Sequence, residues 1–584
     1  MAQAHEASTT GRSSSSFAMK PGAIGCHVPE CLQERISVLK LISSEAKQEL
    51  LVYPQVFLKA SIEVFSVTLI ITWLITLVWF PEQIFKHPAR PIIGSFNPCF
   101  GWDYAPASFI ALSLCSVNVF LTYRYAWLDQ RRAVLLNPVK RTPAQNLSKW
   151  TSGLLAFASS LWLLLWLVGP NGDKPGDEDG PVMRNWFLHT FIFFFYAASS
   201  YLCVVGNFWE VATGPTKDSI TLSNTIYIWV YGLSTAYLVV VYLYNLLHYV
   251  HGSPPAVHPL LTQAADIIWM SCQGVITSFM PVEQPIKLTF VIYTGEAGEV
   301  VEEERNSVYR CPKCLRDFSN IAFLASADVT NRVMRPQKYL TAVGEVFMYT
   351  LISTWVLTLV FFPHQIVEHP ARPIIGSFNP CFGWDYPPAS YIALFFCSFN
   401  VYLTYRYAWL DYVRSALLNP DGLTSAQTFS TIASNVLAIS SNTWLLLWLI
   451  GPNGDKPRDD DGPVMRNWFI HTAIFVFYAF ASYAAAVGNF WEVASAPSAE
   501  EITLKHKIYL VAYSSAVLYL VVVYFYDLLC YEEGQPPALN PILTQTADVV
   551  WIVTFSQSSK FLPAEPPMLE TATLITGDEE KALE

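Results

Sequence analysis

Histidine, arginine and aspartate side chains recur in one stretch that the chain carries twice. The residues HPARPIIGSFNPCFGWDY run from His87 to Tyr104 and again, without a change, from His369 to Tyr386. An arginine can bind a phosphate group through two parallel hydrogen bonds, and a histidine can change its charge near neutral pH. This chemistry predicts two related binding sites for a lipid headgroup. Their candidate residues are His87, Arg90 and Asp103 in the first copy and His369, Arg372 and Asp385 in the second.

The identity of this loop needs a reason, because the neighbouring apolar segments have diverged, as in SIEVFSVTLIITWLITLVWF against VGEVFMYTLISTWVLTLVFF. A binding surface is one reason, with Phe96, Phe100 and Trp102 resting at the membrane interface. A required backbone path is another, since Pro88 and Pro91 fix the angle φ. Contact with a partner protein is the third.

A second polar group stands at the start of a later apolar segment in each half. Arg184 and His189 in the first half match Arg466 and His471 in the second. We expect these four residues to complete the two headgroup sites. The plainer interpretation is that Arg and His at a helix end extend toward the membrane interface.

Four cysteines form two pairs outside the apolar segments. They are Cys26 and Cys31 in GCHVPEC, and Cys311 and Cys314 in YRCPKC. Thiolates in a reducing compartment can bind a structural zinc ion, and free or palmitoylated thiols are the alternative. The sequence contains no P-loop, HExxH or GxSxG motif, so we assign no catalytic residue and do not favour an enzyme.

The composition indicates a membrane protein. Hydrophobic residues make up 53% of the 584 residues and charged residues only 14%. The apolar residues form runs long enough to cross a bilayer as helices. The net charge is −11 and there is no long basic patch, which argues against nucleic-acid binding. The candidate spans of the first half are 62–80, 107–123, 151–169, 187–206, 226–247 and 264–282.

The second half repeats the first. Adding 282 to a residue number gives the matching residue over about 54–281, which indicates a tandem duplication. Two matching units share one orientation only if each contains an even number of spans. We therefore predict an all-α polytopic membrane protein, a duplicated six-helix bundle with about twelve transmembrane helices arranged as parallel repeats. The predicted domains are a cytosolic, partly disordered arm (1–50), a first bundle (51–283), a cytosolic linker (284–333), a second bundle (334–565) and a cytosolic tail (566–584).

Charged residues between the apolar runs predict the orientation. The segment after the second run contains Arg131, Arg132, Lys140, Arg141 and Lys149, whereas the segment after the third run is mainly acidic. Cytosolic loops carry an excess of Lys and Arg, so we expect the basic segment in the cytosol. Both termini then lie in the cytosol, and both copies of the repeated loop lie on the lumenal or extracellular side.

Several short motifs occur in a fixed order within one unit. A long first loop is followed by a second helix ending in YRY, by His189 at the start of the fourth helix, and by Asp266 shortly before Trp269. This order resembles the six-helix family of the damage-regulated autophagy modulators (DRAM proteins) and the post-GPI-attachment lipid-remodelling proteins. The resemblance implies a Golgi, ER, lysosomal or plasma-membrane location and a role in GPI-anchor lipid exchange or autophagy regulation.

Three functions remain open from the sequence. The first is a lipid- or GPI-related protein whose lumenal loops bind headgroups, with membrane lipids and other membrane proteins as partners. The second is a solute transporter made of two pseudo-equivalent bundles, and the third is a structural subunit of a membrane assembly. A cavity shared by both halves at the middle of the membrane would favour transport.

Overall fold

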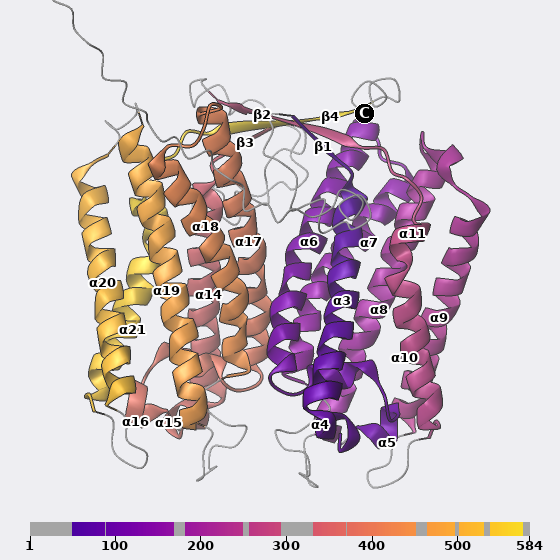
Figure 1. The fold of residues 1–584 in the computed structure, drawn as a ribbon, viewed down its shortest axis with the longest axis horizontal. Helices are drawn as coiled ribbons and strands as arrows, with labels where there is room; N and C mark the ends of the chain where they lie inside the picture. The colour runs from indigo at the N-terminus through magenta and orange to yellow at the C-terminus, as the bar shows by residue number, and fades with distance from the viewer. Residues whose placement is uncertain are drawn as a thin grey trace, which may run out of the picture.

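The computed structural model describes residues 49–87, 89–168, 182–248, 256–293, 331–369, 371–450, 464–496, 502–530 and 538–575. Of the residues that the structure describes, 78% are helical, as predicted. Two bundles of long helices stand side by side, and a small sheet lies across one end of both (Figure 1). We call this end of the molecule the sheet end and the opposite end the pocket end.

Each bundle contains six long helices. The apolar runs form helices because a helix satisfies its backbone hydrogen bonds internally. The first bundle consists of α3 (Pro54–Trp79), α6 (Ala107–Leu136), α7 (Pro143–Trp162), α8 (Val182–Thr213), α9 (Leu222–Leu247) and α10 (Pro259–Gly274). The second consists of α14 (Gln337–Phe361), α17 (Ala389–Leu418), α18 (Ser425–Trp444), α19 (Val464–Ser495), α20 (Leu504–Leu529) and α21 (Pro541–Ser556).

The helices of the two bundles correspond in pairs. Five pairs begin and end at positions that differ by 282, and α3 and α14 differ by one residue at their start. Shorter helices recur in the same way. They are α4 (Pro81–Phe85), α5 (Arg90–Ile93), η1 (Pro98–Trp102), η2 (Leu163–Trp166) and α11 (Ile276–Phe279), matched by α15 (Pro363–Val367), α16 (Arg372–Ile375), η6 (Pro380–Trp384), η7 (Leu445–Trp448) and α22 (Ser558–Phe561). The short helix η3 (Lys217–Ser219) has no counterpart among the described residues.

Seven of the described helices are long and apolar enough to cross a membrane, which makes the chain a membrane-embedded helical protein. They are α3, α6, α8 from Phe187, α9, α14, α19 from Phe469, and α20.

A four-stranded antiparallel sheet that was not predicted accompanies the helices. Its strands are β1 (Glu49–Val52), β2 (Ile286–Ile292), β3 (Asn331–Met334) and β4 (Met568–Leu574), in the order β1-β2-β4-β3. β2 lies in the expected linker and β4 in the expected tail, whereas β1 crosses the expected boundary between arm and first bundle and β3 that between linker and second bundle. The central pair, β2 and β4, runs from Ile286 opposite Leu574 to Ile292 opposite Met568. The sheet therefore joins segments that flank both bundles.

The bundles touch along α6 and α17, mainly through aromatic side chains. Phe120 stacks on Tyr405 with ring centroids 5.3 Å apart, and Tyr123 meets Phe399 edge to face at 5.2 Å. Such ring pairs add stabilisation beyond the area that they bury.

The predicted basic loop after the second span is partly wrong. Helix α6 continues to Leu136, so Arg131 and Arg132 lie in the helix, and both are buried. Arg132 donates to Asp129 at 2.8 Å and to Glu210 at 2.7 Å. Burial is tolerated because the guanidinium is paired with carboxylates. The corresponding residues Arg414, Asp411 and Glu492 form the same network in the second bundle.

Candidate functional site

The repeated loop docks closely on the pocket end of its bundle. Gly94 has a φ of 93°, and a Cβ at this position would collide with Gln263 of α10. A Cβ at Gly101 would lie 2.7 Å from the Cα of Trp73 in α3, closer than side chains tolerate. The loop can therefore follow this path only with glycine at these positions. The second copy makes the same two close approaches at Gly376 and Gly383.

Within the loop, His87 holds Asp103 in place. The His87 Nε2 lies 2.9 Å from the Asp103 Oδ2, and the backbone N–H of Ala89 donates to His87 Nδ1 at 3.1 Å. Because Nδ1 accepts a hydrogen bond, the ring proton is on Nε2 and is donated to Asp103. The buried ring of His87 also stacks on Phe100, with centroids 3.9 Å apart. We therefore interpret His87 as a positioning residue for the carboxylate.

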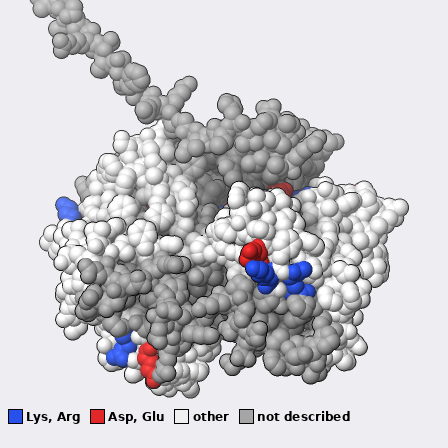
Figure 2. Space-filling view, turned by 60° about the horizontal axis from the view of Figure 1, so that its bottom comes forward, with Lys and Arg blue, Asp and Glu red and all other residues white. Residues whose placement is uncertain are grey.

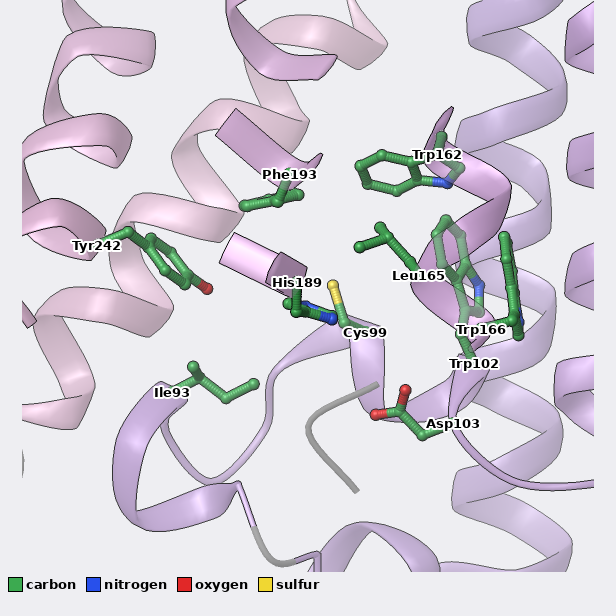
Figure 3. Close-up of a pocket in the computed structure, with 10 residues that line it drawn as sticks. All are labelled: Ile93, Cys99, Trp102, Asp103, Trp162, Leu165, Trp166, His189, Phe193 and Tyr242. Atoms are coloured by element: carbon green, nitrogen blue, oxygen red, sulfur yellow. The ribbon is translucent and has the colours of Figure 1, made fainter. Parts of the chain in front are cut away.

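Asp103 and His189 meet in a cavity of about 40 Å³ at the pocket end of the first bundle (Figure 3). A space of this size accepts a few water molecules or one small polar group. Figure 3 shows the Asp103 carboxylate pointing toward Cys99, while the Tyr242 hydroxyl points in from the other side. The lining residues are Ile93, Cys99, Trp102, Asp103, Trp162, Leu165, Trp166, His189, Phe193 and Tyr242.

The second bundle contains an equivalent cavity of about 40 Å³. We call the two cavities the aromatic pockets. Every residue of the second is of the same type as its counterpart 282 positions earlier. Its lining residues are Ile375, Cys381, Trp384, Asp385, Trp444, Leu447, Trp448, His471, Phe475 and Tyr524.

The aromatic pockets have an electronegative interior. A second carboxylate, that of Asp266, lies behind Tyr242 and accepts a hydrogen bond from its hydroxyl group at 2.7 Å. Burial raises the pKa of the Cys99 thiol well above its ordinary value, and the charges of Asp266 and Asp103 raise this pKa further. Negative charge nearby disfavours the thiolate. Cys99 is therefore a neutral thiol, and each lining contains one carboxylate but no Lys or Arg.

Two of the predicted arginines do not reach the aromatic pockets. The Arg90 Nη1 donates to the carbonyl oxygen of Phe85 at the end of α4, and Arg372 makes the matching bond to Val367. These arginines therefore hold the loop and do not line the cavities. Of the predicted residues, Arg90 and Arg372 are therefore not brought together with Asp103, His189 and their counterparts around the cavities.

The expectation that Phe96, Phe100 and Trp102 of the loop lie at the membrane interface is also mostly wrong. Phe100 and Trp102 are buried, and only Phe96 is exposed. The Trp102 Nε1 donates to the Thr72 hydroxyl of α3 at 2.8 Å, so this ring packs into the bundle. On the face drawn in Figure 2, most of the described surface is uncharged, and the charged groups are small and separate. No broad basic surface for phosphate appears among the described residues of this face.

The remaining predicted residues divide into two groups. His189 and His471 line the aromatic pockets together with residues of the repeated loop. The start of the fourth helix of each unit therefore lies beside this loop, as expected. The positions of Arg184 and Arg466 lie near the starts of α8 and α19, but their side chains lie outside the described part of the chain. The expected zinc ligands Cys26, Cys31, Cys311 and Cys314 also lie outside the described residues.

Sequence reasoning missed most of the aromatic wall. Trp162 and Trp166 come from the end of α7 and η2, and Trp166 stacks on Trp102 at 5.5 Å. The segment WLLLWL occurs unchanged in both halves, at 162–167 and 444–449. This identity between the halves, like that of the repeated loop, could have indicated the two tryptophans as site residues.

No family model, curated protein or solved structure matches the chain. The site is therefore interpreted from its own geometry and chemistry.

Proposed function

We propose that the protein is a twelve-span tandem duplication that binds ammonium-bearing lipid headgroups, one in each aromatic pocket. Seven helices already satisfy the length and apolarity of a span. Helix α10 is short, but α10 and α11 together cover 259–279, about 30 Å of helix. Six spans in each bundle give both units the same orientation. Both pockets then open on the lumenal or extracellular side, with the sheet in the cytosol.

The observation that carries the ligand class is a carboxylate placed among aromatic rings. Each aromatic pocket has one Asp, three Trp, one Tyr and one Phe in its lining, and no Lys or Arg. Aromatic faces attract ammonium cations, and a desolvated site strengthens that attraction. The carboxylates of Asp103 and Asp385 supply the counter-charge. An ethanolamine headgroup combines a small size with a primary ammonium group.

The lipid class agrees with the functions that the sequence resemblance implies. Lipid remodelling of GPI anchors requires a protein that recognises membrane lipids at the bilayer surface. The aromatic pockets lie at the end of each bundle, where headgroups are found. We therefore propose an endomembrane or plasma-membrane protein of this type.

Transport is less well supported by the polar groups inside the bundles. Asn97 and Tyr242 both donate to Asp266 of their own bundle, and Gln55 donates to Asn207 at 3.0 Å. The two described cavities are separate, one in each bundle. These contacts favour two independent binding sites over one central pathway.

The test compares lipid binding of the wild type with that of Asp103→Asn/Asp385→Asn. Native mass spectrometry would count the lipids retained from nanodiscs of phosphatidylethanolamine, phosphatidylcholine or phosphatidylglycerol. We expect up to two ethanolamine lipids on the wild type and about 10- to 100-fold weaker binding by the variant, the range for a lost hydrogen bond between charged groups. The fold should persist, because the Asn carbonyl can still accept from His87 and His369.

Preferential retention of phosphatidylglycerol by the wild type would contradict the cation assignment. Equal retention of phosphatidylethanolamine by the variant would contradict the role of the carboxylates. Preferential retention of phosphatidylcholine by the wild type would still assign a cationic headgroup, but one with a quaternary ammonium group.

A further inference from the structure

Three buried arginines meet where α6 and α17 touch near the sheet. The exposed fractions of Arg124, Arg131 and Arg406 are 3%, 0% and 2%. The Cζ atom of each lies within 6.0 Å of the centroid of the Trp127 ring. The three guanidinium groups therefore share one small region between the bundles, which we call the arginine cluster.

One carboxylate from the sheet faces the arginine cluster. The Glu570 Oε1 accepts from Arg131 Nη1 at 2.6 Å, and its Oε2 accepts from Arg406 Nη2 at 3.2 Å. The side chain of Glu570 is fully buried. Both of its oxygens are thus engaged with two of the three arginines.

Arg124 is in a different situation. Among the described residues it has no hydrogen-bond or ion-pair partner, and its guanidinium lies over aromatic rings, the nearest being Trp127 at 4.8 Å. Three guanidinium groups and one carboxylate leave a formal charge of +2 in the described part of the cluster. A buried charge without a counter-charge is strongly unfavourable.

The duplication explains why the described part of the cluster has a single carboxylate. Arg124 and Arg406 occupy matching positions, 282 residues apart. The position that matches Glu570 is Leu288 on β2, which is fully buried. The first unit therefore has the arginine of this pair without the carboxylate.

We propose that Arg124, together with Arg406, binds an oxyanion of the phosphate type between the two bundles. Guanidinium groups match the geometry of phosphate oxygens, and basic sites between transmembrane helices are suited to phospholipid headgroups. The oxyanion is either the phosphate of a lipid or free inorganic phosphate. The site lies at the sheet end, away from the aromatic pockets, and does not depend on their ligand.

The test uses the full chain in dodecyl maltoside, which contains no phosphate, in a phosphate-free buffer. Inorganic phosphate and phosphatidylglycerol are titrated separately, and the unfolding temperature is measured. A ligand that binds only the folded state should raise this temperature by about 2–5 °C near saturation. The Arg124→Gln variant should lose the rise, whereas Arg90→Gln, which changes an arginine at the pocket end, should keep it.

The two titrations distinguish the sources of the oxyanion. A rise with inorganic phosphate assigns the free ion, and a rise with the lipid alone assigns the headgroup. The absence of a rise with either ligand in the wild type would overturn the proposal, as would an equal rise in Arg124→Gln. If Arg124→Gln fails to fold, Arg124→Lys serves instead, with about tenfold weaker binding expected because lysine lacks the planar fork.

Discussion

The buried His87 and the partly buried Asp103 form a hydrogen-bonded pair in which the histidine proton is fixed on Nε2. Replacing His87 with Ala removes this bond and the stacking on Phe100, and it leaves the carboxylate without its donor. We expect the free energy of unfolding to fall by about 2–4 kcal/mol, from the lost hydrogen bond to a charged group and the cavity left behind. Thermal unfolding in detergent would measure the loss.

The neighbouring Lys86 provides the control. Its ammonium pairs with Glu82 at 2.8 Å, but both side chains are largely exposed. An exposed pair one helical turn apart contributes only about 0.3–0.5 kcal/mol, so Lys86→Ala should be nearly neutral. Equal stability of His87→Ala and Lys86→Ala would show that His87 has no structural part in the loop.

At the scale of elements, the short helix η1 packs directly on α3. The Cβ of an alanine at position 101 would lie 2.7 Å from the Trp73 Cα, which is backbone and cannot move independently. We expect Gly101→Ala to destabilise the protein by about 1–3 kcal/mol, the usual effect of overpacking. The same substitution should also weaken headgroup binding, because Asp103 directly follows η1 and would move with it.

Gly153 in α7 is the matched control, since a Cβ there has no neighbour within 4 Å. Alanine favours a helix interior over glycine by about 0.5–1 kcal/mol, so Gly153→Ala should be neutral or stabilising. A larger loss of stability in Gly153→Ala than in Gly101→Ala would rule out the close approach as the reason for the glycine.

The long helices could be predicted because each is an apolar run of sufficient length. Their ends could not, because α6 continues through Arg131 and Arg132, whose charges are paired only in the folded bundle. The sheet could not be predicted either. β2 carries the alternation of a strand, with Ile286, Leu288 and Phe290 buried between polar residues, but its partners come from three other segments of the chain that no sequence pattern links to it.

The candidate site was predictable only in part. The identity of the repeated loop indicated His87 and Asp103, and the helix start indicated His189. Residue type alone suggested that Arg90 binds a ligand, whereas its side chain donates a hydrogen bond to Phe85 at the end of α4. A second acidic group, Asp266, lies behind the lining, and only the fold brings it close to Cys99.

At the scale of the whole molecule, the proposed orientation places the sheet end in the cytosol. Asn146 in the sequence NLS is the single N-glycosylation sequon of the chain, and its side chain is exposed near the start of α7. Burial of Arg131 and Arg132 leaves Lys140, Arg141 and Lys149 to indicate the cytosolic side. We expect Asn146 to stay unmodified in a eukaryotic cell, because glycans are added only on the lumenal side.

A sequon in the acidic segment between α7 and α8 completes the topology test. Asp177→Asn with Asp179→Thr creates the sequence NET there, and the proposed orientation exposes this segment to the lumen. A mobility shift that a glycosidase reverses should therefore appear for this variant and be absent from the wild type. A shift in the wild type that Asn146→Gln removes would reverse the orientation. The aromatic pockets would then face the cytosol and the arginine cluster the lumen, and each lipid would have to come from the opposite leaflet.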